Sequence, residues 1–75
     1  MGKLGRLPAK KVLKKLARAG FHQAHQRGSH LYLQNGDGTK TVTVPMHGSK
    51  DIPVGTLHAI VVQQARLSVD EFNTL

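Results

Sequence analysis

The sequence predicts an α+β domain with the element order α-β-β-β-α. Apolar residues recur with a helical period near both ends of the chain, in residues 9–17 and 57–65. Between them, residues 30–34 and 40–44 alternate between apolar and polar side chains, and the Asn-Gly-Asp-Gly sequence at 35–38 is typical of a hairpin turn. These features favour a three-stranded antiparallel sheet that is covered by helices on one face.

The first helix is predicted to open at Leu7 and Pro8, because proline is tolerated in the first turn of a helix. Gly20 follows the helix at a position suited to a left-handed cap, and Phe21 can pack back onto the last turn. The apolar side chains form one stripe: Ala9, Val12, Leu13, Leu16 and Ala17. The other face is cationic and consists of Lys10, Lys11, Lys14, Lys15 and Arg18.

The predicted sheet has two unlike faces. Residues 21–26 form a short first strand, and Arg27, Gly28 and Ser29 form the turn into the second. Since strand side chains alternate between faces, one face is apolar and the other is open and polar. The apolar face carries Leu31, Leu33, Val42 and Val44, and the polar face carries His30, Tyr32, Thr41 and Thr43.

The C-terminal part is predicted to be helical after a loop at residues 46–51. Pro45 ends the third strand, and the second helix begins near Pro53 or Thr56. Its buried stripe is Leu57, Ile60, Val61, Gln64 and Ala65. Ser68 and Glu71 read as a capping box for a last short turn, which Phe72 and Leu75 pack onto the core.

Length and composition restrict the class of protein. A chain of 75 residues makes one domain at most, here residues 1–75 with a loose basic start at 1–6. There is no cysteine, so neither a disulfide nor a thiolate-bound metal is available. No apolar run approaches the ~20 residues of a membrane span, and no signal-peptide core follows the N-terminus. We therefore expect a cytoplasmic protein that does not insert into a membrane.

The net charge of +7 is unevenly distributed. Residues 1–30 contain eight lysines and arginines and no acid, whereas the remainder contains three basic and four acidic residues. Such a basic surface attracts nucleic acid, an anionic membrane or an acidic protein. Lys10, Lys11, Lys14 and Arg18 are candidate phosphate-binding residues on the first helix, and the alternative is an ordinary solvated face.

The Gly28-Ser29-His30 sequence is the candidate catalytic motif. Cleavage of RNA without a metal needs a base for the 2′-OH proton, an acid for the leaving 5′ oxygen, and cations or N–H groups for the charge on phosphorus. Histidine can carry such protons because its ordinary pKa of about 6.5 lies near neutrality. Arg27 could bind phosphate through its planar fork, Gly28 allows close approach of the backbone, and Ser29 offers a hydroxyl and an N–H. The alternative is a hairpin turn that a histidine happens to follow.

Two further residues are candidate auxiliary groups. His47 could carry a second proton if the loop after the third strand folds back beside His30, and Tyr32 shares the polar sheet face with His30. A metal site built from His22, His25 and His30 is the weaker alternative, because no cysteine, aspartate or glutamate lies nearby in the sequence. We expect no metal and no cofactor.

Several short motifs in fixed order resemble one family over residues 6–74. They are Leu7-Pro8, Ala19-Gly20-Phe21, Gln26-x-Gly28-Ser29-His30, Val42-Thr43-Val44-Pro45-x-His47, Gly55-Thr56-Leu57-x-x-Ile60 and Leu67-Ser68-x-x-Glu71-Phe72. Each motif is weak, but together they resemble the HicA toxins of bacterial and archaeal toxin–antitoxin pairs.

The resemblance implies a fold, an activity and a partner. The fold would be that of double-stranded-RNA-binding domains, and the activity would be endoribonuclease cleavage of mRNA, which halts translation and growth. The catalytic residue would be His30. A HicB antitoxin would bind the toxin and occlude the His30 site, and the pair would repress its own promoter DNA through the antitoxin.

The chain departs from the family pattern at His25, Met46 and His58, where many relatives carry arginine or lysine. These differences thin the basic surface near the sheet and the second helix. Two other functions stay open at this point: a module that binds duplex RNA without cleaving it, and a DNA-binding regulator. The regulator ranks low, because the predicted elements contain no helix-turn-helix.

Overall fold

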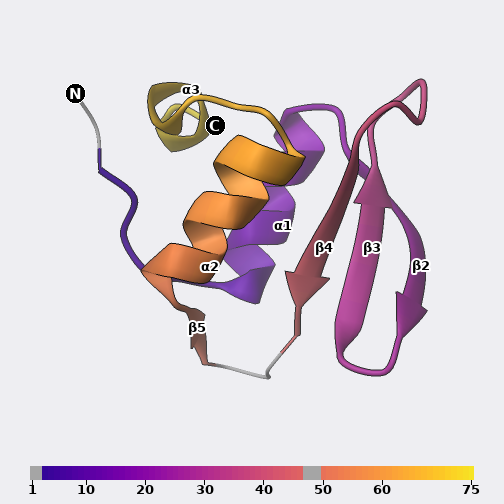
Figure 1. Cartoon of the computed structure of the whole chain (residues 1–75), viewed down its shortest axis with the longest axis horizontal. Coiled ribbons are helices and arrows are strands. Elements are labelled where there is room, and N and C mark those ends of the chain that lie inside the picture. The colour runs from indigo at the N-terminus through magenta and orange to yellow at the C-terminus, as the bar shows by residue number, and fades with distance from the viewer. Residues whose placement is uncertain (1–2, 47–49) are drawn as a thin grey trace.

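The computed structural model describes residues 3–46 and 50–75 of the chain (Figure 1). Its elements in chain order are β1 (Leu7–Pro8), α1 (Ala9–Arg18), β2 (His22–Arg27), β3 (His30–Gln34), β4 (Thr41–Pro45), β5 (Asp51–Ile52), α2 (Val54–His58), the π-helical segment η1 (Ala59–Gln64) and α3 (Val69–Asn73). The main sheet is antiparallel with the order β2-β3-β4. The predicted α+β class and the α-β-β-β-α arrangement of double-stranded-RNA-binding domains are confirmed.

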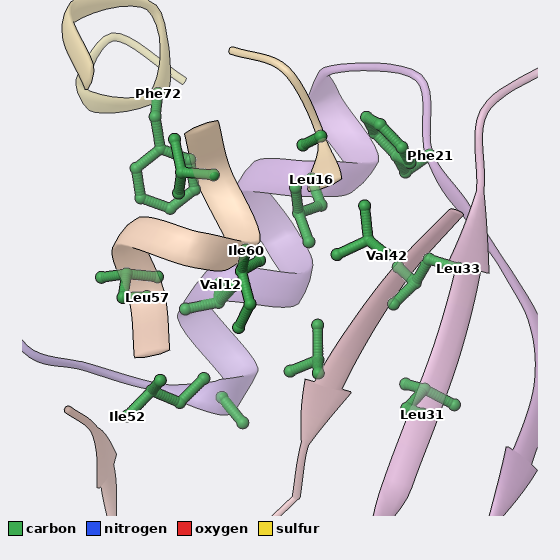
Figure 2. Packing of buried hydrophobic residues seen from close by; sticks show 14 residues of the cluster. Val12, Leu16, Phe21, Leu31, Leu33, Val42, Ile52, Leu57, Ile60 and Phe72 are labelled. Carbon is green, nitrogen blue, oxygen red and sulfur yellow. The ribbon is translucent and has the colours of Figure 1, made fainter. Parts of the chain in front are cut away.

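The alternation in β3 and β4 places the apolar residues on one face, as predicted. Leu31 lies opposite Val44 and Leu33 lies opposite Val42, and all four side chains are buried. Val12 and Leu16 of α1 pack against this face, and Ile60 of the second helix belongs to the same cluster (Figure 2). The complete core is Ala9, Val12, Leu16, Phe21, Leu31, Leu33, Val42, Val44, Ile52, Leu57, Ile60, Val61, Ala65 and Phe72.

The end of α1 shows the predicted left-handed glycine cap. Gly20 has a φ of +96°, its N–H bonds to the carbonyl of Ala17, and the Phe21 N–H bonds to the carbonyl of Leu16. This is the Schellman arrangement, in which the residue after the glycine also packs on the last helical turn. Phe21 is accordingly buried and belongs to the cap, and the first strand of the sheet begins one residue later than predicted, at His22.

The start of α1 differs from the prediction. Leu7 and Pro8 do not open the helix but form β1, which pairs with Ile52 and Asp51 of β5. Asp51 therefore lies in a strand and not in the predicted loop. Pro8 is the residue that caps α1, with extended backbone (φ −66°, ψ 149°). This conformation is compatible with the fixed φ of proline, and it allows the Pro8 carbonyl to accept the first hydrogen bond of the helix.

The second helix runs from α2 directly into η1. Its buried residues are Leu57, Ile60, Val61 and Ala65, as predicted, and Gln64 is only half-buried. The Gln64 Oε1 accepts a hydrogen bond of 2.7 Å from the backbone N–H of Thr43. A backbone N–H at the outer edge of β4 thus donates a hydrogen bond to a side chain of the second helix. Figure 1 shows this helix running alongside β4.

The last helix, α3, is held by the predicted capping box and by a lysine from α1. The Glu71 N–H donates to Ser68 Oγ (3.0 Å), and the Ser68 N–H donates to Glu71 Oε1 (3.1 Å). Lys15 Nζ donates to the carbonyls of Phe72 and Leu75 and lies 5.1 Å from the centre of the Phe72 ring. Residues 72–75 are therefore held against α1 by contacts between the half-buried Lys15 and the buried Phe72 ring and by the hydrogen bonds of Lys15.

The two edges of the main sheet are different. β4 is covered by η1, whereas all six residues of β2 are exposed. The pairing of β2 with β3 shifts register between Gln23 and His25, which is a bulge of one residue at Ala24. After the bulge, His25 lies opposite Tyr32 and Arg27 lies opposite His30. His25 and Arg27 therefore share the open sheet face with His30 and Tyr32.

Candidate active site

A tight turn positions His30 at the beginning of β3. Arg27 and His30 form the last pair of the β2–β3 hairpin, and Gly28 and Ser29 form the two-residue turn between them. Gly28 has a φ of +56°, and Ser29 is not among the residues of positive φ. This is the pattern of a type II′ turn, in which glycine occupies the first central position. The glycine is therefore required by the backbone of the turn that presents His30.

Hydrogen bonds from both neighbouring segments fix this turn. The Gln26 side chain donates to the carbonyl of Gly28 (3.1 Å), and the Met46 N–H donates to the carbonyl of Ser29 (2.6 Å). The second bond joins the turn to the end of β4. Because Leu31 is anchored in the core, the preceding residue His30 projects from the opposite, uncovered face of the sheet.

His30 lines a groove between the sheet and the second helix. The groove has a volume of about 420 Å³ and is lined by His30, Thr43, Pro45, Pro53, Thr56, Ala59, Ile60 and Gln64. We name it the histidine groove. One wall is formed by His30, Thr43 and Pro45 of the sheet, and the other is formed by Pro53 and the α2–η1 helix. Pro53 caps this helix without a side-chain hydrogen bond, so its first N–H groups have no acceptor from the capping side chain.

The chemical content of the histidine groove is simple. His30 is its only titratable side chain among the described lining residues, and it is exposed. Thr43, Thr56 and Gln64 add hydroxyl and amide groups, and Arg27 lies across the hairpin from His30. Within residues 3–46 and 50–75 there is no group of three or more His, Cys, Asp or Glu that could hold a metal ion. The only group among the described lining residues that could exchange a proton near neutral pH is therefore the imidazole of His30.

A second groove is strongly cationic. It has a volume of about 200 Å³ and is lined by Lys11, Lys14, Lys15, Arg18 and Leu75. We name it the lysine groove. It shares no lining residue with the histidine groove. Its four cationic residues belong to α1, which packs against the apolar face of the sheet (Figure 2). His30 precedes the buried Leu31 in β3 and therefore projects from the other face.

The predicted site residues thus fall into two groups. Arg27, Gly28, Ser29, His30 and Tyr32 lie together on the β2–β3 hairpin. Lys10, Lys11, Lys14 and Arg18 are exposed on α1 and are not brought to His30. The remaining candidate, His47, lies outside the described residues.

Sequence reasoning missed the helical wall of the histidine groove. Thr56 and Pro53 were considered only as helix starts, and Gln64 only as part of a buried stripe. One signal was present: Gln64 is a polar residue in an otherwise apolar stripe, and such a residue needs a hydrogen-bond partner. That partner is the Thr43 N–H, so the hydrogen bond joins the second helix to β4 at a residue that also lines the histidine groove.

The open face beside the groove carries a pair of stacked rings. His25 of β2 and Tyr32 of β3 lie with their ring centres 4.5 Å apart and their planes at 11°. His25 is exposed and Tyr32 is half-buried. The sequence predicted that Tyr32 would lie on this face but made no prediction for His25, which the two-residue Gly28–Ser29 turn places opposite Tyr32.

The fold and the hairpin describe a small basic α+β protein with a histidine on an open sheet face. A comparison with protein families agrees with this description: the family described as the HicA toxin of bacterial toxin–antitoxin systems matches residues 9–67. The chain belongs to the HicA toxin family. No curated protein matches the chain. Within the described residues, no helix is long and apolar enough to cross a membrane.

Proposed function

We propose that this toxin is a metal-independent endoribonuclease that cleaves mRNA in the cytoplasm and so arrests translation and growth. The observation that carries the proposal is the position of His30. It follows a tight turn, it lines a groove, and Arg27 lies across the hairpin from it. The family membership supports the toxin role.

The proposed reaction is attack of a ribose 2′-OH on the adjacent phosphorus. The 2′ oxygen forms a bond to phosphorus as its proton leaves, and the bond from phosphorus to the 5′ oxygen breaks as that oxygen takes a proton. The products are a 2′,3′-cyclic phosphate and a 5′-OH. His30 carries one of these two proton transfers. His47 stays the candidate for the other transfer.

The phosphate is held by charge and by backbone donors. Arg27 can present two parallel N–H groups to two phosphate oxygens, and the Gly28–Ser29 turn exposes its backbone at the same place. Pro53 and Thr56 line the groove at the start of α2, and the N-terminal end of a helix favours an anion through the helix dipole. These donors would stabilise the charge that develops on phosphorus in the transition state.

The cations of α1 have a different role in this proposal. Lys10, Lys11, Lys14 and Arg18 attract RNA and hold its backbone at a distance from the reacting phosphate. Such contacts are largely independent of sequence and weaken with salt, because bound phosphates release counterions. They raise the encounter rate and the affinity without entering the chemical step.

The partner in this proposal is a HicB antitoxin that covers the histidine groove. The groove is open in the isolated chain, and a protein seated on it would exclude RNA from His30. Promoter DNA would be bound only by the toxin–antitoxin complex, through the antitoxin. Co-expression with the antitoxin should restore growth, and the bound antitoxin should slow hydrogen exchange in the β2–β3 turn.

The test is inducible expression in a bacterial host of wild type, His30→Ala and the control His58→Ala. His58 is also an exposed histidine, but it does not line the groove. Wild type and His58→Ala should stop growth and shorten mRNA, and His30→Ala should do neither while accumulating as folded protein. Full toxicity of His30→Ala would overturn the assignment. RNA binding without any cleavage by wild type would instead favour the binding module.

A further inference from the structure

The stacked pair of His25 and Tyr32 has no role in the proposed chemistry. Its geometry is that of two flat rings in contact, with centres 4.5 Å apart and nearly parallel planes. Cross-strand ring pairs of this kind can stabilise a sheet. Most such gain comes from removing the rings from water, yet His25 remains exposed and Tyr32 is only half-buried.

The place of the pair on the sheet is specific. Arg27 and His30 are the next pair on the same face of the hairpin, two residues away along each strand. Two residues of a strand span about 7 Å, which is close to the length of one nucleotide in an extended single strand. A nucleotide whose phosphate lies at His30 therefore has a neighbour whose base reaches the ring pair.

The distribution of aromatic residues strengthens this argument. The chain has three phenylalanines and tyrosines in total and no tryptophan. Phe21 and Phe72 are buried in the core, so Tyr32 alone is set on the open face. Proteins that bind single-stranded RNA on a sheet use aromatic side chains on the open face to stack bases.

We infer that His25 and Tyr32 together form a stacking site for the base of the nucleotide next to the cleaved phosphate. The inference rests on the proposed ribonuclease function and adds to it the substrate class: a single-stranded segment with an unstacked base. Duplex RNA does not satisfy the site, because its bases are stacked on one another and its edges alone are accessible. The exposed ring of His25 and the half-buried ring of Tyr32 stack on each other in the protein alone, so the ring pair is formed before RNA binds.

The experiment uses an eight-nucleotide 2′-O-methyl RNA, which cannot be cleaved by a 2′-OH mechanism. The fluorescent base 2-aminopurine is placed at each position in turn, and its quenching and the dissociation constant are measured. Wild type should quench one position strongly. The double variant His25→Ala/Tyr32→Val should lose this quenching and bind at least about fivefold more weakly, as expected for a lost base–ring stack.

Three variants make the result specific. His25→Tyr keeps two stacked rings and should keep the quenching, and Gln23→Ala changes an exposed residue of β2 on the other side of the bulge and should change nothing. His30→Ala should still bind and quench although it does not cleave. Urea unfolding of the double variant shows whether its hairpin is folded. If the double variant is unfolded, Tyr32→Phe is used in its place, because it keeps the aromatic ring and removes only the hydroxyl, and it should quench like wild type.

The outcomes separate this inference from the proposed function. If wild type cleaves RNA in a His30-dependent manner but quenches no position, or if the double variant quenches and binds like wild type, the stacking site is wrong and the ribonuclease function stands. If wild type neither binds nor cleaves RNA, the proposed function falls and the stacking site falls with it.

Discussion

The histidine groove and the lysine groove divide the functional properties of this toxin between two faces. The histidine groove has one titratable side chain among its described residues, with threonines, prolines and a glutamine around it. The lysine groove has four cationic side chains and, among its described residues, no group suited to proton transfer at neutral pH. The hydrophobic core lies between α1 and the sheet and separates the two grooves (Figure 2).

If the proposed function is correct, this difference teaches that charge and chemistry need not share a site in a small RNA-cleaving protein. Attraction of RNA acts over a Debye length of about 8–10 Å at moderate salt, so cations can work from a neighbouring face. Proton transfer requires hydrogen-bond contact. A groove for chemistry can therefore remain nearly neutral and accessible, and the net charge of +7 can be carried mainly by α1 and the N-terminal segment.

The largest effect is expected from neutralising the four candidate phosphate-binding cations of α1, three of which line the lysine groove. Replacing Lys10, Lys11, Lys14 and Arg18 together with glutamine should weaken RNA binding more than tenfold at low salt. The slope of log K against log salt should fall by about 0.7 for each phosphate contact that is lost. The cleavage rate at saturating RNA should stay within twofold of wild type. A collapse of that rate in folded protein would show that the two grooves are not separate.

The turn under His30 can be tested with a matched pair of glycines. Gly28→Ala places a side chain at φ +56° and should cost about 1–2 kcal/mol of unfolding free energy, with a loss of cleavage as His30 is displaced. Gly36→Ala, in the other hairpin turn, meets no atom within 4 Å and has no positive φ, so it should be neutral. Urea unfolding and cleavage assays measure both. Equal stability losses would contradict the role of the backbone at Gly28.

Two adjacent lysines on α1 provide a smaller and sharper contrast. Lys15 donates to two carbonyls at the chain end and lies over Phe72, whereas Lys14 is exposed. Lys15→Gln should lower the unfolding free energy by about 1 kcal/mol, as is typical of a lost charged hydrogen bond. Lys14→Gln should leave stability unchanged and weaken RNA binding. The reverse pattern would mean that Lys15 belongs to the binding surface and not to the fold.

The smallest effect concerns Asp37 in the β3–β4 turn. Hydrogen bonds from the Thr39 side chain and backbone to its carboxylate hold the pKa of Asp37 below its usual value. A carboxylate with a lowered pKa stabilises the fold above the pKa it has in the unfolded chain, and this contribution is lost as the pH falls through its folded pKa. The stability difference between wild type and Asp37→Asn should therefore be small at pH 7 and shrink further towards pH 3. A difference that grows on acidification would contradict this sign.

Much of the fold was predictable from local signals. The alternation in β3 and β4 set which residues are buried, Gly20 marked the end of α1, and Ser68 with Glu71 marked the start of α3. The β1–β5 pair was not predictable. It joins two-residue segments that are 43 or more positions apart, and neither Leu7–Pro8 nor Asp51–Ile52 is long enough to show a period. Only tertiary packing determines such a pair.

The site was predictable as a motif but not as a surface. Gly28, Ser29 and His30 are adjacent in sequence, so their turn could be recognised. The groove needs the second helix to lie beside β4, which depends on the Gln64–Thr43 hydrogen bond across 21 residues. The partner of His25 is set by the two-residue turn, which places it opposite Tyr32, and the bulge at Ala24 shifts the register of His22 and Gln23 beyond it.

The most direct test of the central claim is the initial cleavage rate of one oligoribonucleotide by purified wild type, His30→Ala and His58→Ala, with the product ends identified. We expect wild type and His58→Ala to cleave alike in the presence of EDTA and to leave a 2′,3′-cyclic phosphate. His30→Ala should bind the RNA but cleave at least 100-fold more slowly, which is the low end of what a general acid–base group contributes, ~10²–10⁴-fold. A His30→Ala protein that cleaves at the wild-type rate would contradict the assignment of this histidine to the chemical step.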